Sequence, residues 1–240
     1  MRGMNEKKAN LMMHLEELRS RIIISLTALL LGMAFCFVFG QELIFQILLA
    51  PLEKLGQELV LISVTEGFLI QIKTAFLGGL LLALPVILWQ GIAFILPALY
   101  KKERCIFWPL FMSSLLLFGL GIVFAYQCVL DLGLKFLLLD FNAGLTPMLS
   151  AAKYVSFVIT FLLPFGFVFE MPVVVFILTK SGLITPAQLR SARRYVVVGI
   201  FIIAAVLTPP DVISQVLLAL PMLFLYEISI VVSTLIFKLK

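Results

Sequence analysis

The segment "MMHLEELRSR" (Met12–Arg21) runs directly into "IIISLTALLLGMAFCFVFG" (Ile22–Gly40), and this junction decides the fold. The second stretch carries no charge, and its length is close to the roughly 20 residues that a helix needs to cross a bilayer. A cleavable signal peptide is not expected here, because the apolar run is too long and no A-x-A site follows it. The junction therefore predicts a membrane-spanning helix that is entered from a charged segment.

The composition supports a membrane protein. The chain has 240 residues, of which 62% are hydrophobic and 13% are charged, whereas a soluble domain usually carries about 25% charged residues. Three cysteines, at positions 36, 105 and 128, are scattered along apolar runs. This pattern predicts neither a disulfide framework nor a metal site, so all three are expected to be small buried hydrophobic residues.

Uncharged or nearly uncharged runs predict the other spans. Each span must be a helix, because lipid satisfies no backbone hydrogen bond and the alternation of barrel strands is absent. No internal repeat or soluble domain interrupts the pattern, so residues 1–240 are expected to form one all-α, polytopic membrane domain. Its six predicted transmembrane helices cover residues 22–40, 67–100, 105–130, 154–179, 195–208 and 212–237.

Capping patterns predict where several helices begin. "TPAQ" (185–188) resembles a capping box with proline at the first helical position, so the short fifth span should belong to a helix that starts in the preceding loop. "TPPD" (208–211) and "SVTE" (63–66) should start the sixth and second helices. The long loops, 41–66 and 131–153, are expected to contain amphipathic helical pieces at the membrane interface.

The basic residues predict the orientation. Fourteen of the 18 Lys and Arg residues fall in the N-terminal segment, the 101–104 and 180–194 loops and the C-terminus. Cytoplasmic loops carry such an excess, so both termini are expected in the cytoplasm, with anionic lipid headgroups as neighbours.

The motif inventory argues against an enzyme. No Walker lysine loop and no G-x-S-x-G motif is present, and His14 is the only histidine, which excludes a histidine-based metal site or a Ser-His pair within the membrane. No catalytic residue, metal, cofactor or nucleic-acid partner is therefore expected. The classes of function that remain are binding, transport and scaffolding.

Two acids interrupt the predicted spans. Glu170 lies in "FLLPFGFVFEMPVVVF", where a lipid-facing carboxylate costs about 3 kcal/mol. Pro164 and Pro172 flank it and should bend the helix. Glu170 is therefore a candidate intramembrane polar site, although a carboxylate held only for packing is the alternative. Glu227, in "LFLYEISIV", lies nearer the cytoplasmic end and fits a functional or a structural role equally well.

Two further acids lie on the basic cytoplasmic side. On a helix, His14, Glu17 and Arg21 share one face, and Glu16–Arg19 and Glu17–Arg21 have the spacing of helical ion pairs. Arg19 and Arg21 can also reach headgroup phosphates. Glu103 is the only acid of "PALYKKER" (97–104). Ordinary surface pairing would account for both acids; alternatively, they offer carboxylates to an incoming guanidinium.

Five motifs, which occur in one order along the chain, favour the interpretation that these acids bind an incoming guanidinium. The chain resembles the TatC family, the multispanning receptor subunit of the twin-arginine protein translocase. The resemblance covers nearly the whole chain. It is carried by "HLEELRSR" (14–21), "APL" (50–52), "GIAFILPALYKKER" (91–104), "FVFEMP" (167–172) and "LTPPDVISQ" (207–215).

The resemblance implies a concave, glove-shaped bundle of six helices in the bacterial inner membrane, with both termini cytoplasmic. It also implies recognition of the paired arginines in the signal peptides of folded precursor proteins. Export would then use the proton-motive force, with the single-span partners TatA and TatB and with self-association.

The resemblance also assigns candidate residues. Glu17 and Glu103 match the positions associated with arginine binding, Phe94 and Pro97 shape the same site, and Arg19 belongs to the same motif as Glu17. Glu170 matches the intramembrane acid. The candidates for translocation or partner contact are Pro51, Asp211, Gln215 and Glu227.

Two other functions compete with a signal-peptide receptor. A proton- or ion-coupled secondary transporter would use Glu170 as its coupling carboxylate, but the inverted repeat and the second broken helix of such folds are missing. A scaffold that only organises other helices would leave the cytoplasmic acids unexplained.

Overall fold

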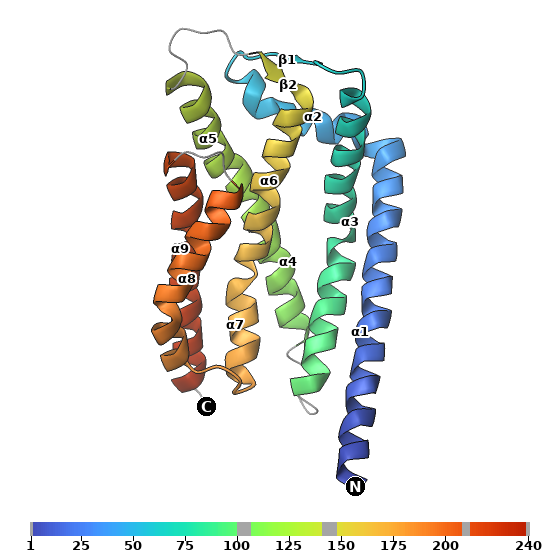
Figure 1. Ribbon diagram of the computed structural model, residues 1–240, viewed down its shortest axis with the longest axis vertical. Coiled ribbons are helices and arrows are strands. Elements are labelled where there is room, and N and C mark those ends of the chain that lie inside the picture. The colour runs from blue at the N-terminus through green and yellow to red at the C-terminus, as the bar shows by residue number, and fades with distance from the viewer. Residues whose placement is uncertain (1, 100–106, 141–147, 208–211, 239–240) are drawn as a thin grey trace. The chain divides into compact units, whose positions relative to one another are not determined.

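The computed structural model describes residues 2–99, 107–140, 148–207 and 212–238, which are almost entirely helical (Figure 1). The chain packs as two units, Met1–Ile44 with Gln71–Leu115 and Phe45–Ile70 with Leu116–Lys240. The single domain stays a prediction. The elements are α1 (Arg2–Phe35), η1 (Cys36–Gly40), α2 (Gln41–Glu53), β1 (Leu59–Val60), α3 (Glu66–Leu99), α4 (Phe107–Phe124), η3 (Ala125–Leu130), α5 (Asp131–Lys135), η4 (Phe136–Asp140), β2 (Leu149–Ser150), α6 (Ala151–Phe169), α7 (Met171–Lys180), α8 (Pro186–Leu207) and α9 (Val212–Lys238).

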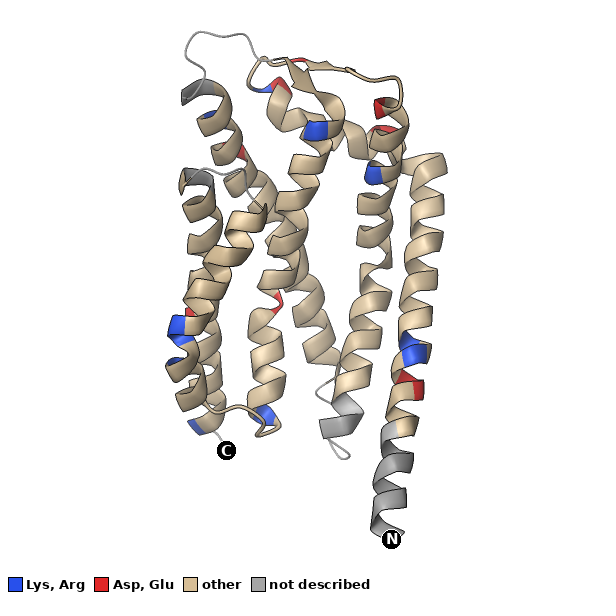
Figure 2. Ribbon diagram, viewed as in Figure 1, with Lys and Arg blue, Asp and Glu red and all other residues tan. Residues whose placement is uncertain are grey.

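The all-α, membrane-spanning fold class is confirmed. Within the described residues, 5 helical runs are long and apolar enough to cross a bilayer. The fifth predicted span, 195–208, is not among these runs and corresponds to α8, whose first turns carry Arg190, Arg193 and Arg194 and whose apolar part begins only at Tyr195. The central turns of α3 carry no charged residue, and α1 carries none after Arg21 (Figure 2).

In the first unit, α1 and α3 pack backbone against backbone. A Cβ at Gly32 would lie 2.6 Å from the carbonyl oxygen of Gly79, and a Cβ at Gly79 would lie 2.4 Å from the backbone nitrogen of Met33. One turn away, Cys36 is buried with its Sγ 2.8 Å from the position of a Cβ at Gly78. Small residues are therefore required along this helix crossing.

In the second unit, α4 packs on α6 through aromatic rings. Phe118, Phe161 and Phe165 are at most 1% exposed, and a Cβ at Gly166 would lie 2.6 Å from the Phe118 ring. The helices α7, α8 and α9 pack beside one another (Figure 1). A hydrogen bond of 2.8 Å between the buried hydroxyls of Thr179 and Ser233 joins α7 to α9.

Two tyrosines bind the part of α2 that its proline disrupts. Pro51 has no N–H, so the carbonyl of Ile47, four residues earlier, loses its helical donor. The Tyr126 hydroxyl donates to this carbonyl at 2.5 Å. The buried Tyr154 hydroxyl donates to the next one, that of Leu48, at 2.7 Å. The two bonds hold α2 against η3 and α6.

The capping predictions agree with the helix starts that the structure describes. The box at 185–188 is confirmed, because the Thr185 N–H donates to Gln188 Oε1 at 2.8 Å and the Gln188 N–H donates to Thr185 Oγ1 at 3.3 Å. The segment 63–66 starts the second predicted helix as expected, since α3 begins at Glu66, whose Oε2 accepts from the Ile62 N–H at 2.9 Å. α9 begins at Val212 as predicted, and its predicted cap at 208–211 lies outside the described residues.

Other predictions about the connections need correction. The helical piece expected at 41–66 forms as α2, but it continues α1 through η1 without a break. The piece expected at 131–153 likewise prolongs α4 through η3, α5 and η4, stabilised by the Asp131–Lys135 ion pair at 2.7 Å.

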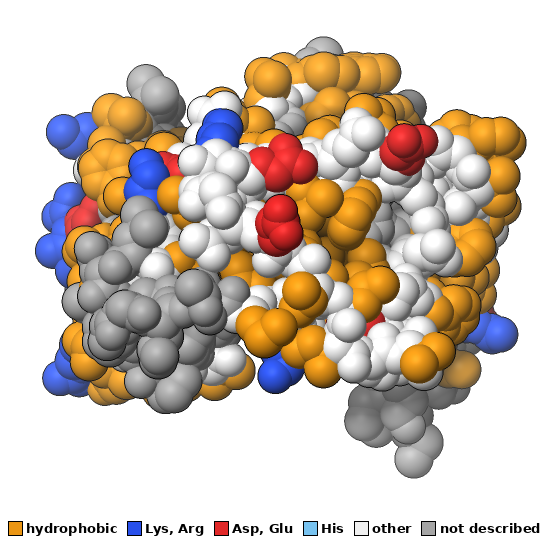
Figure 3. All heavy atoms as spheres, turned by 90° about the horizontal axis from the view of Figure 1, so that it is seen from above, with side chains coloured by type: hydrophobic (Ala, Val, Ile, Leu, Met, Phe, Trp, Pro, Cys, Tyr) orange, Lys and Arg blue, Asp and Glu red, His pale blue; other side chains and the backbone are white. Residues whose placement is uncertain are grey.

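A parallel contact between β1 and β2 pairs Leu59 with Leu149 and Val60 with Ser150, and no sequence pattern predicted it. The surface around these strands mixes acidic, polar and hydrophobic side chains (Figure 3). Among the cysteines, Cys36 is buried as predicted, Cys128 is exposed, which contradicts the prediction, and Cys105 lies outside the described residues.

Candidate functional site

The candidate site is built around Glu17, near the start of the predicted first span. Helical spacing places His14, Glu17 and Arg21 on one face of α1, as predicted. Arg21 donates from Nε at 3.0 Å and from Nη2 at 2.7 Å, both to Oε1 of Glu17. These bonds hold the pKa of the Glu17 carboxyl below its usual range, so the group is ionised at neutral pH.

The second oxygen of Glu17 is in a different environment. Oε2 lies 3.7 Å from Nδ1 of His14, which is too long for a hydrogen bond but close enough for an ion pair when the imidazole is protonated. The Glu17 side chain is 38% exposed. A ligand can therefore reach Oε2, whereas Oε1 is already occupied.

The helix α3 fixes this cluster from its other side. Arg21 Nη1 donates to Oε1 of Gln90 at 3.0 Å. The His14 ring stacks on Phe94 with 4.4 Å between ring centroids and 13° between ring planes. Contacts on both sides thus restrict the rotation of the arginine and the imidazole, and the Glu17 carboxylate is held in one orientation.

An apolar groove of about 380 Å³ begins at this cluster. Arg21 and Gln90 supply polar groups, while the rest of the lining is almost entirely hydrophobic. A carboxylate beside such a groove can bind a ligand that joins a cation to an apolar segment. The remaining lining residues are Leu18, Ile22, Ser25, Leu26, Leu29, Ile87, Gly91 and Phe94.

The other predicted signal-peptide residues divide into two groups. Arg19 is exposed and lies outside the cluster, and among the described side chains it forms no ion pair with Glu16. The side chain of Pro97 and all of Glu103 lie outside the described residues. The sequence did not predict the contacts of Arg21 with Gln90 or of His14 with Phe94.

Glu170 lies at the junction of α6 and α7, which interrupts the fourth predicted span. The α6 helix ends at Phe169, the Glu170 N–H donates to the carbonyl of Phe167 at 3.1 Å, and α7 starts with Pro172 in its first turn. Figure 2 shows an acidic position between two uncharged helical stretches there. The helix is interrupted directly before Pro172, whereas α6 continues through Pro164, and the Glu170 side chain is half-buried.

Among the residues that the structure describes, no interaction brings the candidate partner-contact residues together. Pro51 lies in α2 beside the Tyr126 hydrogen bond described above. Gln215 Nε2 donates to the Phe201 carbonyl at 3.0 Å, which ties α9 to α8. Glu227 is exposed and pairs with Arg193 at 2.7 Å. Asp211 lies outside the described residues.

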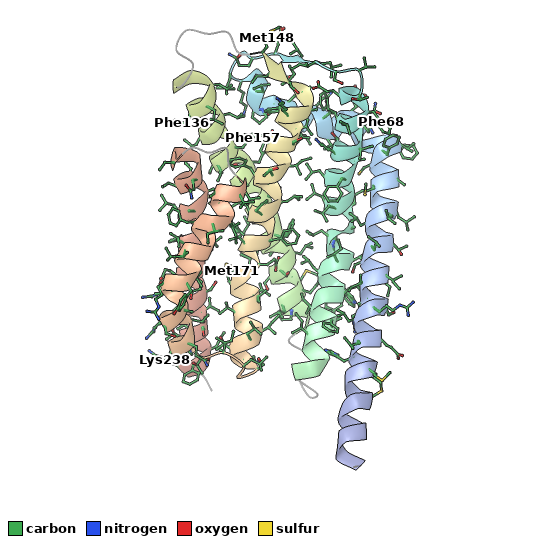
Figure 4. The ribbon with its side chains drawn as sticks, viewed as in Figure 1. Phe68, Phe136, Met148, Phe157, Met171 and Lys238 are labelled. Atoms are coloured by element: carbon green, nitrogen blue, oxygen red, sulfur yellow. The ribbon has the colours of Figure 1, made fainter. Side chains whose placement is uncertain are left out.

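A smaller groove of about 280 Å³ lies within the second unit. Its lining includes Met148 beside β2 and Phe157 on α6 (Figure 4). Of the described residues that line it, Lys153 alone is charged, and none of them is a predicted site residue.

Comparison with known proteins identifies the family. The model of "Sec-independent protein translocase protein (TatC)" matches residues 13–221. A TatC of Aquifex aeolicus is 49% identical over 90% of this chain and 91% of its own. A TatC of Escherichia coli K12 is 41% identical over 93% of this chain and 87% of its own.

Solved structures agree with the sequence comparison. A crystal structure of the twin arginine translocase receptor TatC matches with a TM-score of 0.86 and 48% identity, over 93% of this chain and 99% of that one. A second crystal structure of that receptor, in DDM, matches with a TM-score of 0.85 and 49% identity, over 91% and 98%. The chain therefore belongs to the TatC family, so it is a multi-pass subunit of the twin-arginine protein translocase of the bacterial inner membrane and not an enzyme.

Proposed function

We propose that Glu17 binds one arginine of a twin-arginine signal peptide, and that the apolar groove beside it receives the hydrophobic stretch of that peptide. One observation carries this proposal. Arg21 and Gln90 hold the Glu17 carboxylate in one orientation beside a groove lined by apolar side chains. A guanidinium donor to a carboxylate makes a strong, directional bond, and the free Oε2 is its acceptor.

Glu103 is the proposed partner of the second arginine. It follows α3 in the sequence and is the only acid in a loop with Lys101, Lys102 and Arg104. Pro97, at the end of the same helix, and the exposed Arg19 would border the bound peptide. Two carboxylates would distinguish an arginine pair from a lysine pair, because an ammonium group lacks the planar fork of the guanidinium.

Neutralising Glu17 tests the proposal. Glu17→Gln should weaken the binding of an Arg-Arg signal peptide by about ten- to a hundredfold, since a charge-assisted hydrogen bond is lost. Titration of a labelled peptide into the protein in nanodiscs measures the dissociation constant. A Lys-Lys peptide should bind wild type more weakly than the Arg-Arg peptide does.

Glu16→Gln is the matched control, because it removes the same charge from the neighbouring, exposed position of α1. It should leave the dissociation constant within about a factor of two, as expected for a side chain outside the site. Equal weakening by both variants would mean that only the general charge of this segment matters, and the Glu17 site would be rejected.

Glu170 is proposed as a polar site within the fourth span. The helix break places a half-buried carboxylate within the fourth predicted span, and an ionisable residue at such depth usually faces protein or water. Glu170→Gln should retain most export of a twin-arginine substrate in cells, because the amide keeps the shape and hydrogen bonding. Glu170→Leu should reduce export more, and wild-type export by both variants would leave Glu170 without a role.

The partner contacts are proposals as well. TatA and TatB type subunits would meet the chain near Pro51, Asp211, Gln215 and Glu227, with export driven by the proton-motive force. The exposure of the Glu227–Arg193 pair supports an accessible surface there. Self-association and contact of the arginine-rich helix ends with anionic lipid complete the proposed interactions.

A further inference from the structure

The only histidine of the chain lies inside the proposed arginine site. His14 Nδ1 is 3.7 Å from Oε2 of Glu17, the carboxylate oxygen that Arg21 leaves unoccupied. The imidazole is 44% exposed and its ring lies flat on Phe94. Its position is therefore fixed next to the atom to which a ligand guanidinium would bind.

The charge of His14 decides how this oxygen is occupied. A neutral imidazole carries no charge to attract Glu17 or to repel a cation. A protonated imidazole forms an ion pair with Oε2 and repels a positively charged ligand at the same place. Histidine is the side chain whose charge ordinarily changes between pH 5 and 8.

The other groups around the cluster keep their charge in this range. On α1 these are the Glu17 carboxylate and the Arg21 guanidinium. From α3 the facing side chains are Gln90 and Phe94, which do not titrate. Lys101, Lys102, Glu103 and Arg104 follow α3 outside the described residues, and none of these residue types ordinarily titrates near neutral pH.

We propose that His14 is a proton-controlled competitor for the ligand oxygen of Glu17, so that the site accepts an arginine only while His14 is neutral. The inference rests on the proposed function, because it concerns the same carboxylate. It assigns His14 a role in specificity: Arg21 occupies Oε1 permanently, and His14 occupies Oε2 when it is protonated. Acidification of the cytoplasmic side would then release a bound signal peptide.

A titration of the Arg-Arg peptide at two pH values tests the inference. Wild type in nanodiscs should bind about five- to tenfold more weakly at pH 5.5 than at pH 7.5, from one exposed ion pair plus the repulsion of one like charge. His14→Phe keeps a ring to stack on Phe94 but cannot be protonated, so it should bind equally at both pH values. The ionic strength is held constant, since surface charges are screened by salt.

The outcomes separate the two proposals. If the peptide binds wild type with the same affinity at both pH values, or if His14→Phe keeps the full pH dependence, His14 is not the competitor. If the peptide binds at neither pH, the Glu17 site itself is rejected, and the role of His14 falls with it.

A second measurement does not depend on peptide or on the His14→Phe variant. Because the chain has one histidine, NMR of an untagged, ring-labelled sample reports the His14 titration alone. Glu17→Gln should change this titration more than Glu16→Gln does, because Glu17 is the carboxylate within ion-pair distance of the imidazole. Equal midpoints in wild type and Glu17→Gln would overturn the inference.

Discussion

Gly79→Leu should prevent α1 from packing on α3 and sharply reduce the yield of folded protein. A Cβ at position 79 would lie 2.4 Å from the backbone nitrogen and 2.6 Å from the Cα of Met33. Backbone atoms cannot turn away as a side chain can, so the two helices must separate. We expect a loss of about 3 kcal/mol or more, at the upper end of overpacking effects. Thermal unfolding in detergent, followed by intrinsic fluorescence and size exclusion, measures it.

Gly91→Leu is the control for that experiment. Like Gly79→Leu, this variant replaces a glycine of α3 with leucine. A Cβ at Gly91, however, would have no heavy atom within 4 Å other than those of its chain neighbours and of the nearby α3 backbone. Its unfolding temperature should therefore stay close to that of wild type. A Gly79→Leu variant as stable as Gly91→Leu would show that the α1–α3 crossing described above does not exist.

Removing both tyrosine hydroxyls beside α2 should destabilise the second unit. Tyr126→Phe and Tyr154→Phe leave the carbonyls of Ile47 and Leu48 without these donors. The Tyr154–Leu48 bond is buried, and an unpaired buried carbonyl costs about 1–3 kcal/mol. Tyr126→Phe should cost less than Tyr154→Phe, because the Tyr126–Ile47 bond is exposed, and the double variant should lose more than either single variant. Urea or thermal unfolding in detergent gives the difference. Tyr195→Phe, which removes an exposed hydroxyl from α8, is the control.

The proline explains why Tyr126 is needed, and this can be tested separately. Pro51→Ala restores an N–H that can bind the Ile47 carbonyl, so Tyr126→Phe should cost less in the Pro51→Ala background than in wild type. Such coupling is expected for residues that share a hydrogen-bond partner. If the cost of Tyr126→Phe is the same in both backgrounds, the hydroxyl does not replace the missing N–H.

Local patterns in the sequence predicted most of the helices. The uncharged runs predicted the spans because each lipid-facing helix must be apolar over its whole length. The Thr185–Gln188 box predicted a helix start because its two hydrogen bonds join residues three apart. The segment at 63–66 also marked a helix start, because α3 begins at Glu66, whose side chain binds the Ile62 N–H.

Long-range contacts could not be predicted in this way. The Glu17–Arg21 pair is local and follows from helical spacing. The bond from Arg21 to Gln90 joins residues 69 positions apart, and it depends on how closely the glycines let α1 approach α3. The hydroxyl of Tyr154 similarly meets a carbonyl 106 positions away. Sequence motifs thus predicted Glu17 as a candidate, while the fold supplied the groups that orient it.

The short apolar part of α8 has a consequence for the surrounding lipid. From Tyr195 to Leu207 the helix has about 13 apolar residues, which at about 1.5 Å per residue extend only about 20 Å. The hydrocarbon core of a typical bilayer is about 30 Å thick. Such hydrophobic mismatch is relieved when the bilayer thins or flanking arginines reach toward the headgroups. The membrane beside α8 should therefore be thinner than bulk bilayer, which lowers the barrier that a polar surface meets there.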